Sequence, residues 1–147
     1  MNNAKATFAG GCFNDAKSAF EGVRGIIRIT TGFTGGQTVN PSPAEVASGK
    51  SGHAEAIEIE YDPELLEFDQ LLEIFFEYHD PTSHNRQGHL KGPQFRSAIF
   101  CHNDKQRKSA EEGKQLLNRS ELYNRPVVTE VVAAGPFFPC TDKDHGH

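Results

Sequence analysis

A segment near the middle of the chain alternates apolar and acidic side chains, and it limits the available folds more than any other feature. The segment covers residues 54–61 and reads AEAIEIEY. Side chains of a strand point alternately to its two faces, so this pattern predicts a strand with one face buried and the other in water. Whether the alanines or the isoleucines form the buried face depends on the register of the strand.

Further strands and helices are interleaved along the sequence. Apolar residues at helical spacing predict a helix over about 69–79, and weaker helical patterns cover residues 15–22 and 104–118. Residues 35–43 are rich in turn formers and are expected to form a long surface loop, and the tail after the last strand is also expected to be a loop. Further strands are expected over residues 5–9, 26–31 (ending at Gly32), 97–101 and 127–132.

The alternation of the strands decides the fold class. Strands buried on both faces would be apolar throughout, whereas these carry polar residues on one side. We therefore expect an α+β fold with a mixed, mostly antiparallel sheet and flanking helices. The chain has 147 residues, which suits one hydrophobic core, so a single domain over residues 1–147 is expected.

The charge balance excludes some partners. The chain has 15 Lys and Arg against 20 Asp and Glu, a formal net charge of −5. An acidic surface argues against a nucleic acid or an anionic membrane as partner. The first residues are polar, and no hydrophobic stretch is long enough for a signal peptide or a membrane span, which predicts a cytoplasmic protein.

The chain has three cysteines, Cys12, Cys101 and Cys140. A disulfide framework needs more cysteines and usually an even number of them, so none is expected here. Cys12 follows Gly10-Gly11 at the start of a predicted helix, whose N–H groups and dipole favour a negative charge. The pattern predicts a lowered thiol pKa and a reactive nucleophile. The alternative is a small cysteine packed under a tight turn. Cys101 ends a strand without a partner motif and is expected to be structural.

Glu55 is a second candidate for chemistry, because it lies early in a strand and follows Gly52-His53. A glutamate that faces inward among alanines has a raised pKa and can act as a general acid near neutral pH. The alternative is an ordinary solvated strand glutamate, as expected for Glu58 and Glu60.

Two segments rich in histidine and aspartate have the composition of a metal site. They are residues 79–89 and residues 142–147. Neither has the spacing of a helical histidine pair or of a cysteine-based zinc site, so no metal ligands are assigned. His79, at the end of a predicted helix, is expected to cap helix carbonyls.

Nine short motifs, in order and in spacing, resemble those of the peptide methionine sulfoxide reductases of the A type. The resemblance extends from about Ala6 to Phe138. The motifs are Gly10-Gly11-Cys12-Phe13, Gly32-Phe33-Thr34-Gly35-Gly36, Asn40-Pro41, Gly52-His53-Ala54-Glu55-Ala56, Tyr61-Asp62-Pro63, His79-Asp80-Pro81-Thr82, Arg86-Gln87-Gly88, Arg96-Ser97-Ala98-Ile99 and Gly135-Pro136-Phe137-Phe138.

This resemblance implies a thiol mechanism on a mixed sheet with flanking helices. It makes Cys12 the nucleophile that attacks the sulfur of a methionine S-sulfoxide, and Glu55 the acid that protonates the sulfoxide oxygen. The resulting sulfenic acid is resolved by a second thiol, for which Cys140 is the candidate, and then by thioredoxin or another dithiol. No bound cofactor is implied. The expected partners are thioredoxin and methionine sulfoxide in protein, peptide or free form, and a monomer is expected.

The resemblance also implies a set of substrate-binding residues. Phe13 forms one wall of a pocket for the methyl group of the substrate. The full expected set is Phe13, Asn14, Phe33, His53 and Phe95.

The chain departs from the family pattern at several of these positions. Asn14-Asp15 replaces the family's Trp-Gly, and the chain has no tryptophan. Two tyrosines that hydrogen-bond the sulfoxide oxygen align with Pro43 and Phe95, which have no side-chain donor. Leu90 stands where the family has an aspartate.

Two alternatives to the family's reaction therefore stay open. In the first, the same fold and thiol act on a more polar substrate, with Asn14 and Asp15 in the place of the tryptophan and glycine. In the second, the chain is a non-catalytic binding or metal-holding module in which Cys12, Cys140 and nearby histidines are ligands.

Overall fold

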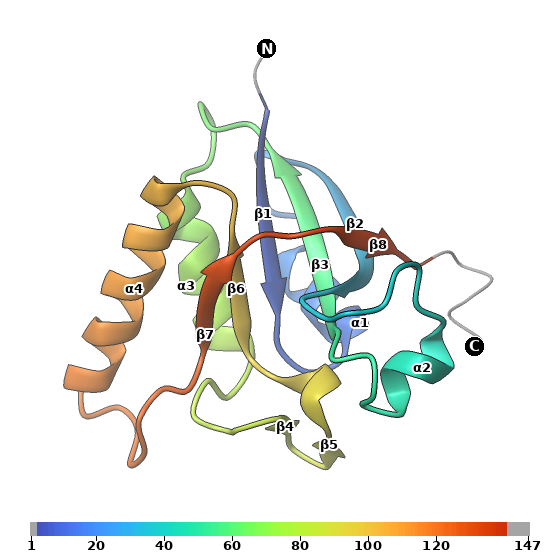
Figure 1. Cartoon of the computed structure of the whole chain (residues 1–147). Helices are drawn as coiled ribbons and strands as arrows, with labels where there is room; N and C mark the ends of the chain where they lie inside the picture. Colours follow the sequence, from blue (N-terminus) through green and yellow to red (C-terminus); the bar gives the residue numbers. More distant parts are fainter. Residues whose placement is uncertain (1–2, 141–147) are drawn as a thin grey trace.

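Six strands form one sheet in the computed structural model, which describes residues 3–140 (Figure 1). Their order is β7-β6-β1-β3-β2-β8, and every neighbouring pair is antiparallel except β6 and β7. This is the mixed, mostly antiparallel sheet of an α+β domain, as predicted. The strands are β1 (Ala4–Ala9), β2 (Ile26–Thr34), β3 (Ala54–Tyr61), β6 (Ala98–Cys101), β7 (Glu130–Ala133) and β8 (Phe137–Pro139); β4 (Arg86–Gln87) and β5 (Leu90–Lys91) form a separate pair.

Helices cover one face of the sheet. The large hydrophobic core lies between this face and the helices, and it contains Phe8 of β1 and Phe75. Within the described part of the chain, no helix is both long and apolar enough to cross a bilayer. The helices are α1 (Phe13–Phe20), α3 (Phe68–Tyr78) and α4 (Asp104–Arg119), with the short α2 (Pro43–Ala47) and the 3-10 helix η1 (Pro93–Phe95) in connecting segments.

The register of β3 assigns its residues to the two faces. Ile57 and Ile59 face the helices and the large core. Ala54 and Ala56 lie in a second, smaller cluster on the opposite face, against which Phe137 packs. The segment from β7 to β8 crosses this opposite face, so the end of the described chain joins one edge of the sheet to the other (Figure 1).

Two predicted elements differ at their ends because of backbone contacts between distant segments. β2 continues through Gly32 instead of ending there, because a glycine lets the backbone of Phe138 approach and β8 pair with it. The tail expected to be a loop therefore contains a strand. The last predicted strand begins at Glu130 rather than Val127, since the N–H groups of Val127 and Val128 bond Asn118 and Pro81 outside the sheet.

The predicted loop over residues 35–43 ends in a short helix that the sequence analysis missed. Ser42 is the N-cap of α2 and accepts a hydrogen bond from the Glu45 N–H at 3.2 Å, while the Glu45 carboxylate accepts one from the Ser42 N–H. This capping box stabilises the start of a helix as short as five residues.

Candidate active site

Cys12 lies at the junction between the end of β1 and the start of α1. It is the N-cap residue of the helix, and Gly11 before it has a φ of 73°, which only glycine adopts without strain. The turn is held from two sides. The Gly11 N–H donates to the Phe95 carbonyl at 3.1 Å, and the Tyr78 hydroxyl donates to the Gly10 carbonyl at 3.0 Å. These two hydrogen bonds therefore fix the backbone that carries the half-buried Cys12 thiol.

Glu55 reaches this turn from the neighbouring strand. It lies on the helix-covered face of β3, together with Ile57, and its Oε1 accepts a hydrogen bond from the Phe13 N–H at 3.1 Å. The inward orientation is therefore confirmed. Glu58 and Glu60 lie on the other face, where they form ion pairs with Lys5 and Arg28.

The predicted direction of the Cys12 pKa shift was wrong, although the N–H groups of the helix act in the expected sense. Burial raises the pKa of Cys12 above its usual value, and the backbone N–H of Asn14 only partly opposes this. The Glu55 carboxylate adds to the rise and so does the Asp15 charge, whereas the Asp15 backbone N–H lowers the pKa. Desolvation penalises a thiolate more than the first turn of α1 stabilises it.

Two aromatic rings stand beside the Cys12 and Glu55 positions. Phe13 and Phe33 are buried, with ring centroids 5.7 Å apart and planes tilted by 38°. Phe33 pairs with Glu55 on β3 and with Phe138 on β8. Three strands thus bring aromatic side chains and the carboxyl group to one face of the sheet.

The other expected substrate residues lie around the same turn. Asn14 is half-buried in the first turn of α1. Phe95 is partly buried, and its carbonyl accepts the hydrogen bond from the Gly11 N–H. His53 is buried, and both ring nitrogens are used by the loop after β2: Nδ1 accepts from the Gly36 N–H at 3.0 Å, and Nε2 donates to the Thr38 carbonyl at 2.7 Å. Roles of these residues toward a substrate remain predictions.

Cys140 directly follows β8, and its N–H donates to the Thr31 carbonyl at 2.8 Å. It is buried in the large core cluster, against which Cys12 packs. Cys101 ends β6 near α4, and burial raises the pKa of its thiol to about 11, in keeping with a structural residue. No disulfide joins any two of these cysteines in the described part of the chain.

Sequence reasoning missed Tyr78 and the buried polar chain that starts at His79. A tyrosine in an apolar helical stretch signals a buried hydroxyl that needs an acceptor, and the Gly10 carbonyl is that acceptor. The predicted capping role of His79 is confirmed, since Nδ1 donates to the Phe75 carbonyl at 2.6 Å. Its Nε2 then accepts from the Ser97 hydroxyl at 2.7 Å, and Ser97 lies 2.7 Å from the Thr129 hydroxyl.

The Gln87 amide orders the segment after His79. Gln87 accepts from the Asp80 N–H at 2.9 Å and donates to the Asp80 carbonyl at 2.7 Å, and its side chain packs near Gly11. Among residues 3–140 no three His, Cys, Asp or Glu side chains are grouped to hold a metal ion. The candidate ligands over 142–147 lie outside the described residues.

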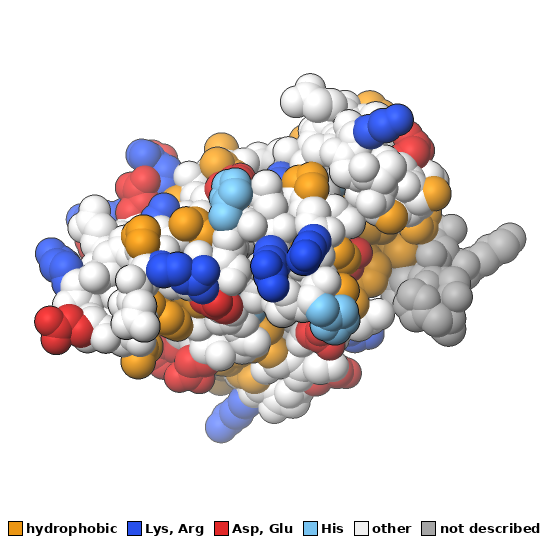
Figure 2. All heavy atoms as spheres, turned by 90° about the horizontal axis from the view of Figure 1, so that it is seen from below, with side chains coloured by type: hydrophobic (Ala, Val, Ile, Leu, Met, Phe, Trp, Pro, Cys, Tyr) orange, Lys and Arg blue, Asp and Glu red, His pale blue; other side chains and the backbone are white. Residues whose placement is uncertain are grey.

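Basic and histidine side chains gather at the same end of the molecule as this segment. Figure 2 shows them on the face that carries β4 and β5. The exposed ones in this segment are His84, Arg86, His89 and Lys91.

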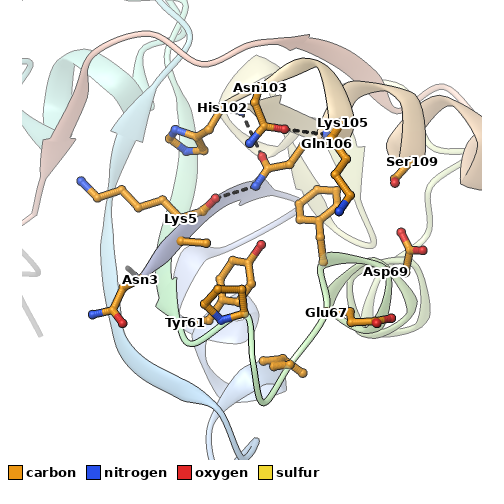
Figure 3. Close-up of a pocket in the computed structure, with 14 residues that line it drawn as sticks. Asn3, Lys5, Tyr61, Glu67, Asp69, His102, Asn103, Lys105, Gln106 and Ser109 are labelled. Carbon is orange, nitrogen blue, oxygen red and sulfur yellow. Dashed lines mark hydrogen bonds between the residues drawn. The ribbon is translucent and has the colours of Figure 1, made fainter. Parts of the chain in front are cut away.

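One cavity lies away from these residues. It has a volume of about 610 Å³ and opens at the other end of β1, where Lys5, Tyr61 and His102 line it (Figure 3). Neither Cys12 nor Glu55 lines this cavity, so it is distinct from the candidate active site.

A cysteine at a helix N-terminus, with a carboxyl group hydrogen-bonded to the next residue, on an α+β sheet is an arrangement suited to an enzyme that uses a cysteine nucleophile. The model of the family "Peptide methionine sulfoxide reductase" matches residues 4–147. The chain belongs to that family.

Individual relatives agree with this assignment. Over 137 residues the chain is 44% identical to the peptide methionine sulfoxide reductase MsrA of Bacillus licheniformis, covering 93% of this chain and 76% of the relative. It is 30% identical to methionine sulfoxide reductase A of Corynebacterium diphtheriae, with a TM-score of 0.82 over 97% of this chain and 72% of that one. Reduced Mxr1 from Saccharomyces cerevisiae gives 25% identity and a TM-score of 0.89 over 97% and 82%.

Proposed function

We propose that this protein reduces methionine S-sulfoxide, free or in a peptide, with Cys12 as nucleophile and Glu55 as general acid. One observation carries the proposal: the Phe13 N–H donates to Glu55 Oε1 at 3.1 Å, which fixes a carboxyl group beside the turn that bears the thiol. A general acid must lie within reach of the oxygen that it protonates, and a fixed position reduces the cost of reaching that geometry.

The proposed reaction transfers one oxygen atom. The Cys12 sulfur attacks the sulfoxide sulfur and forms a sulfur–sulfur bond, while Glu55 protonates the sulfoxide oxygen and the Cys12 thiol proton returns to Glu55. The hydroxyl group then moves from the substrate sulfur to the Cys12 sulfur as the sulfur–sulfur bond breaks, and the methionine thioether leaves. Cys12 is oxidised by two electrons to a sulfenic acid, and the substrate sulfur is reduced by two. The Cys140 thiol then attacks the Cys12 sulfur, releases water and forms a disulfide, which a dithiol returns to two thiols.

The electrostatics around Cys12 support a coupling between the two groups. A charged Glu55 contributes to the raised pKa of Cys12. When Glu55 is protonated, as a general acid must be, this opposition to the thiolate disappears. Protonation of Glu55 therefore makes the Cys12 thiolate easier to form.

The burial of Cys140 in the cluster against which Cys12 packs supports its role as resolving thiol. Thioredoxin is the proposed dithiol, because yeast Mxr1 has also been solved in complex with Trx2, although that structure is only 19% identical to this chain. We further propose that Phe13 and Phe33 hold the methyl group of the substrate, and that Asn14, His53 and Phe95 shape the rest of its site. A cytoplasmic location and a monomeric state stay predictions.

The deciding experiment is reduction of a methionine S-sulfoxide with dithiothreitol as reductant. The R-sulfoxide and a Cys12→Ser variant are the controls. We expect turnover of the S form alone, and only with Cys12 present. Without turnover by a correctly folded protein whose Cys12 still alkylates, the proposal fails, and a more polar substrate, contacted through Asn14, becomes the better hypothesis.

A second experiment isolates the resolving step. In a Cys140→Ser variant, one equivalent of methionine should be released and Cys12 should remain as a sulfenic acid that dimedone labels. Rapid disulfide formation in that variant would remove Cys140 from the mechanism and direct attention to another thiol.

A further inference from the structure

An apolar groove lies between α3 and α4, which stand side by side on the outer surface (Figure 1). Its volume is about 600 Å³, and Leu72, Phe76 and Leu117 contribute to its apolar lining. Two further leucines that line it are largely exposed, Leu116 by 63% and Leu122 by 69%. Contiguous exposed apolar residues of this kind mark interaction surfaces more often than ordinary surface.

Every charged side chain that lines the groove is acidic. Asp69, Glu73 and Glu77 follow one another at intervals of four residues along α3, and Glu112 lies on α4. None of these carboxylates forms an ion pair with a basic side chain of residues 3–140. Like charges four residues apart destabilise a helix, so the row on α3 carries a cost that no ion pair in the described chain offsets.

At one end the groove continues toward the cavity that Lys5, Tyr61 and His102 line. Asp69 of α3 and Ser109 of α4 line both hollows, and both are labelled at the edge of the cavity in Figure 3. From Asp69 to Glu77 the groove follows about 12 Å of helix, enough for two turns of an occupant helix.

We infer that this groove binds a basic amphipathic helix of a partner protein. The leucines of the groove would contact the apolar face of that helix, and the acidic rim would pair with flanking lysines or arginines. Helices commonly dock into grooves between helices through apolar side chains three and four residues apart. A partner that binds as an added β-strand fits this groove less well, because helix side chains line the groove and it has no open strand edge.

The same charges argue against the other occupants of an apolar groove. In a two-fold dimer the groove of one copy would face that of the other, which would bring two acidic rims together. An anionic membrane would be repelled by the same rim. A basic partner is the occupant whose charge complements the groove.

The probe is a fluorescein-labelled peptide of about 16 residues, long enough to form helix on binding. It carries leucines on one face and lysines on either side of them. Two control peptides have glutamate in place of every lysine, or the same composition in shuffled order. Fluorescence anisotropy should give a saturable curve for the probe and at least about tenfold weaker binding for both controls. Its affinity should fall as salt rises.

Matched protein variants locate the site. Leu116→Lys should weaken binding by about tenfold or more, whereas Leu65→Lys, at a leucine 53% exposed outside the groove, should not change it. Glu73→Lys should weaken binding and reduce its salt dependence, and Glu111→Lys, next to Glu112 but outside the lining, should have little effect. Thermal unfolding checks that each variant is folded.

Several results would overturn the inference. They are no saturable binding of the probe, equal binding of the glutamate peptide or the shuffled peptide, and equal losses in groove and control variants. A dimer that Leu116→Lys dissociates would assign the groove to a second copy of the chain. Sedimentation with phosphatidylglycerol vesicles that Leu116→Lys abolishes would assign it to a membrane. Sulfoxide reduction at Cys12 is measured separately and does not enter this test.

Discussion

At the scale of single residues, Glu55 is the group whose substitution separates chemistry from folding most cleanly. Glutamine retains an oxygen that accepts the Phe13 N–H but has no acidic proton to donate. Glu55→Gln should lower kcat for methionine S-sulfoxide by about 100-fold or more, the usual contribution of a general acid, with little change in stability. Glu58→Gln, on the other face of β3, is the control and should retain wild-type turnover. Turnover of Glu55→Gln near that of the wild type would exclude Glu55 as the general acid.

The pKa of Cys12 gives a second prediction at this scale. Since burial and then the Glu55 charge act against the thiolate, alkylation by iodoacetamide should accelerate about tenfold per pH unit above neutrality. At a pH at which Glu55 is charged, Glu55→Gln should make Cys12 alkylate faster because it removes that charge, even though turnover falls. If the alkylation rate instead reached a plateau below neutral pH, the thiol would already be ionised there, and burial would not be the main influence on the pKa of Cys12.

At the scale of elements, the sequence predicted most strands and helices, because their periodicity is a local property. The face of β3 that carries Glu55 was left open, since Ala56 and Ile57 interrupt the alternation and only pairing with β1 and β2 settles the register. The strand β8 was missed for a related reason: a short segment such as Phe137–Pro139 becomes a strand only because β2 offers an edge. Likewise, the sign of the Cys12 pKa shift depends on burial, which no local motif encodes.

The pairing of β2 with β8 depends on Gly32 and leads to a third prediction. A methyl group there would overlap the Phe138 carbonyl and come within 2.7 Å of the Phe137 ring. Gly32→Ala should therefore displace β8 and the Cys140 that follows it, with a loss of about 1–3 kcal/mol in stability. Formation of the Cys12–Cys140 disulfide should slow by about tenfold or more, because small misplacements cost large factors in rate.

Single-turnover oxidation with methionine S-sulfoxide, followed by dimedone labelling of Cys12, measures that step. Gly113→Ala, in α4, is the matched control: its new methyl group would lie 3.5 Å from the Phe76 ring of α3, an ordinary contact between the two helices. It should leave the disulfide step unchanged and raise stability by about 0.5–1 kcal/mol. Wild-type kinetics in Gly32→Ala would show that Cys140 does not depend on β8 for its position.

At the scale of the whole molecule, buried polar contacts connect segments that the strand order leaves apart. His79 ends α3, Ser97 precedes β6 and Thr129 precedes β7, and a chain of hydrogen bonds joins the three. At the same end of the fold, Tyr78 fixes the Gly10 carbonyl beside Cys12. The end of α3 therefore positions both the turn of the nucleophile and the edge of the sheet, so changes there should affect stability and activity together.

Protonation of His79 should make the whole fold sensitive to acid. Burial lowers the pKa of His79 to about 4, against about 6.5 in an unfolded chain, so between these values the unfolded state binds a proton that the folded state does not. Stability should fall as pH drops from about 6.5 toward 4, by up to about 1.4 kcal/mol per pH unit from this residue. Urea unfolding at several pH values should give a shallower dependence for His79→Gln, while the exposed His89→Gln retains the wild-type slope. Parallel curves for His79→Gln and wild type would mean that His79 is already protonated in the folded protein, and that its contact with Ser97 runs in the opposite direction.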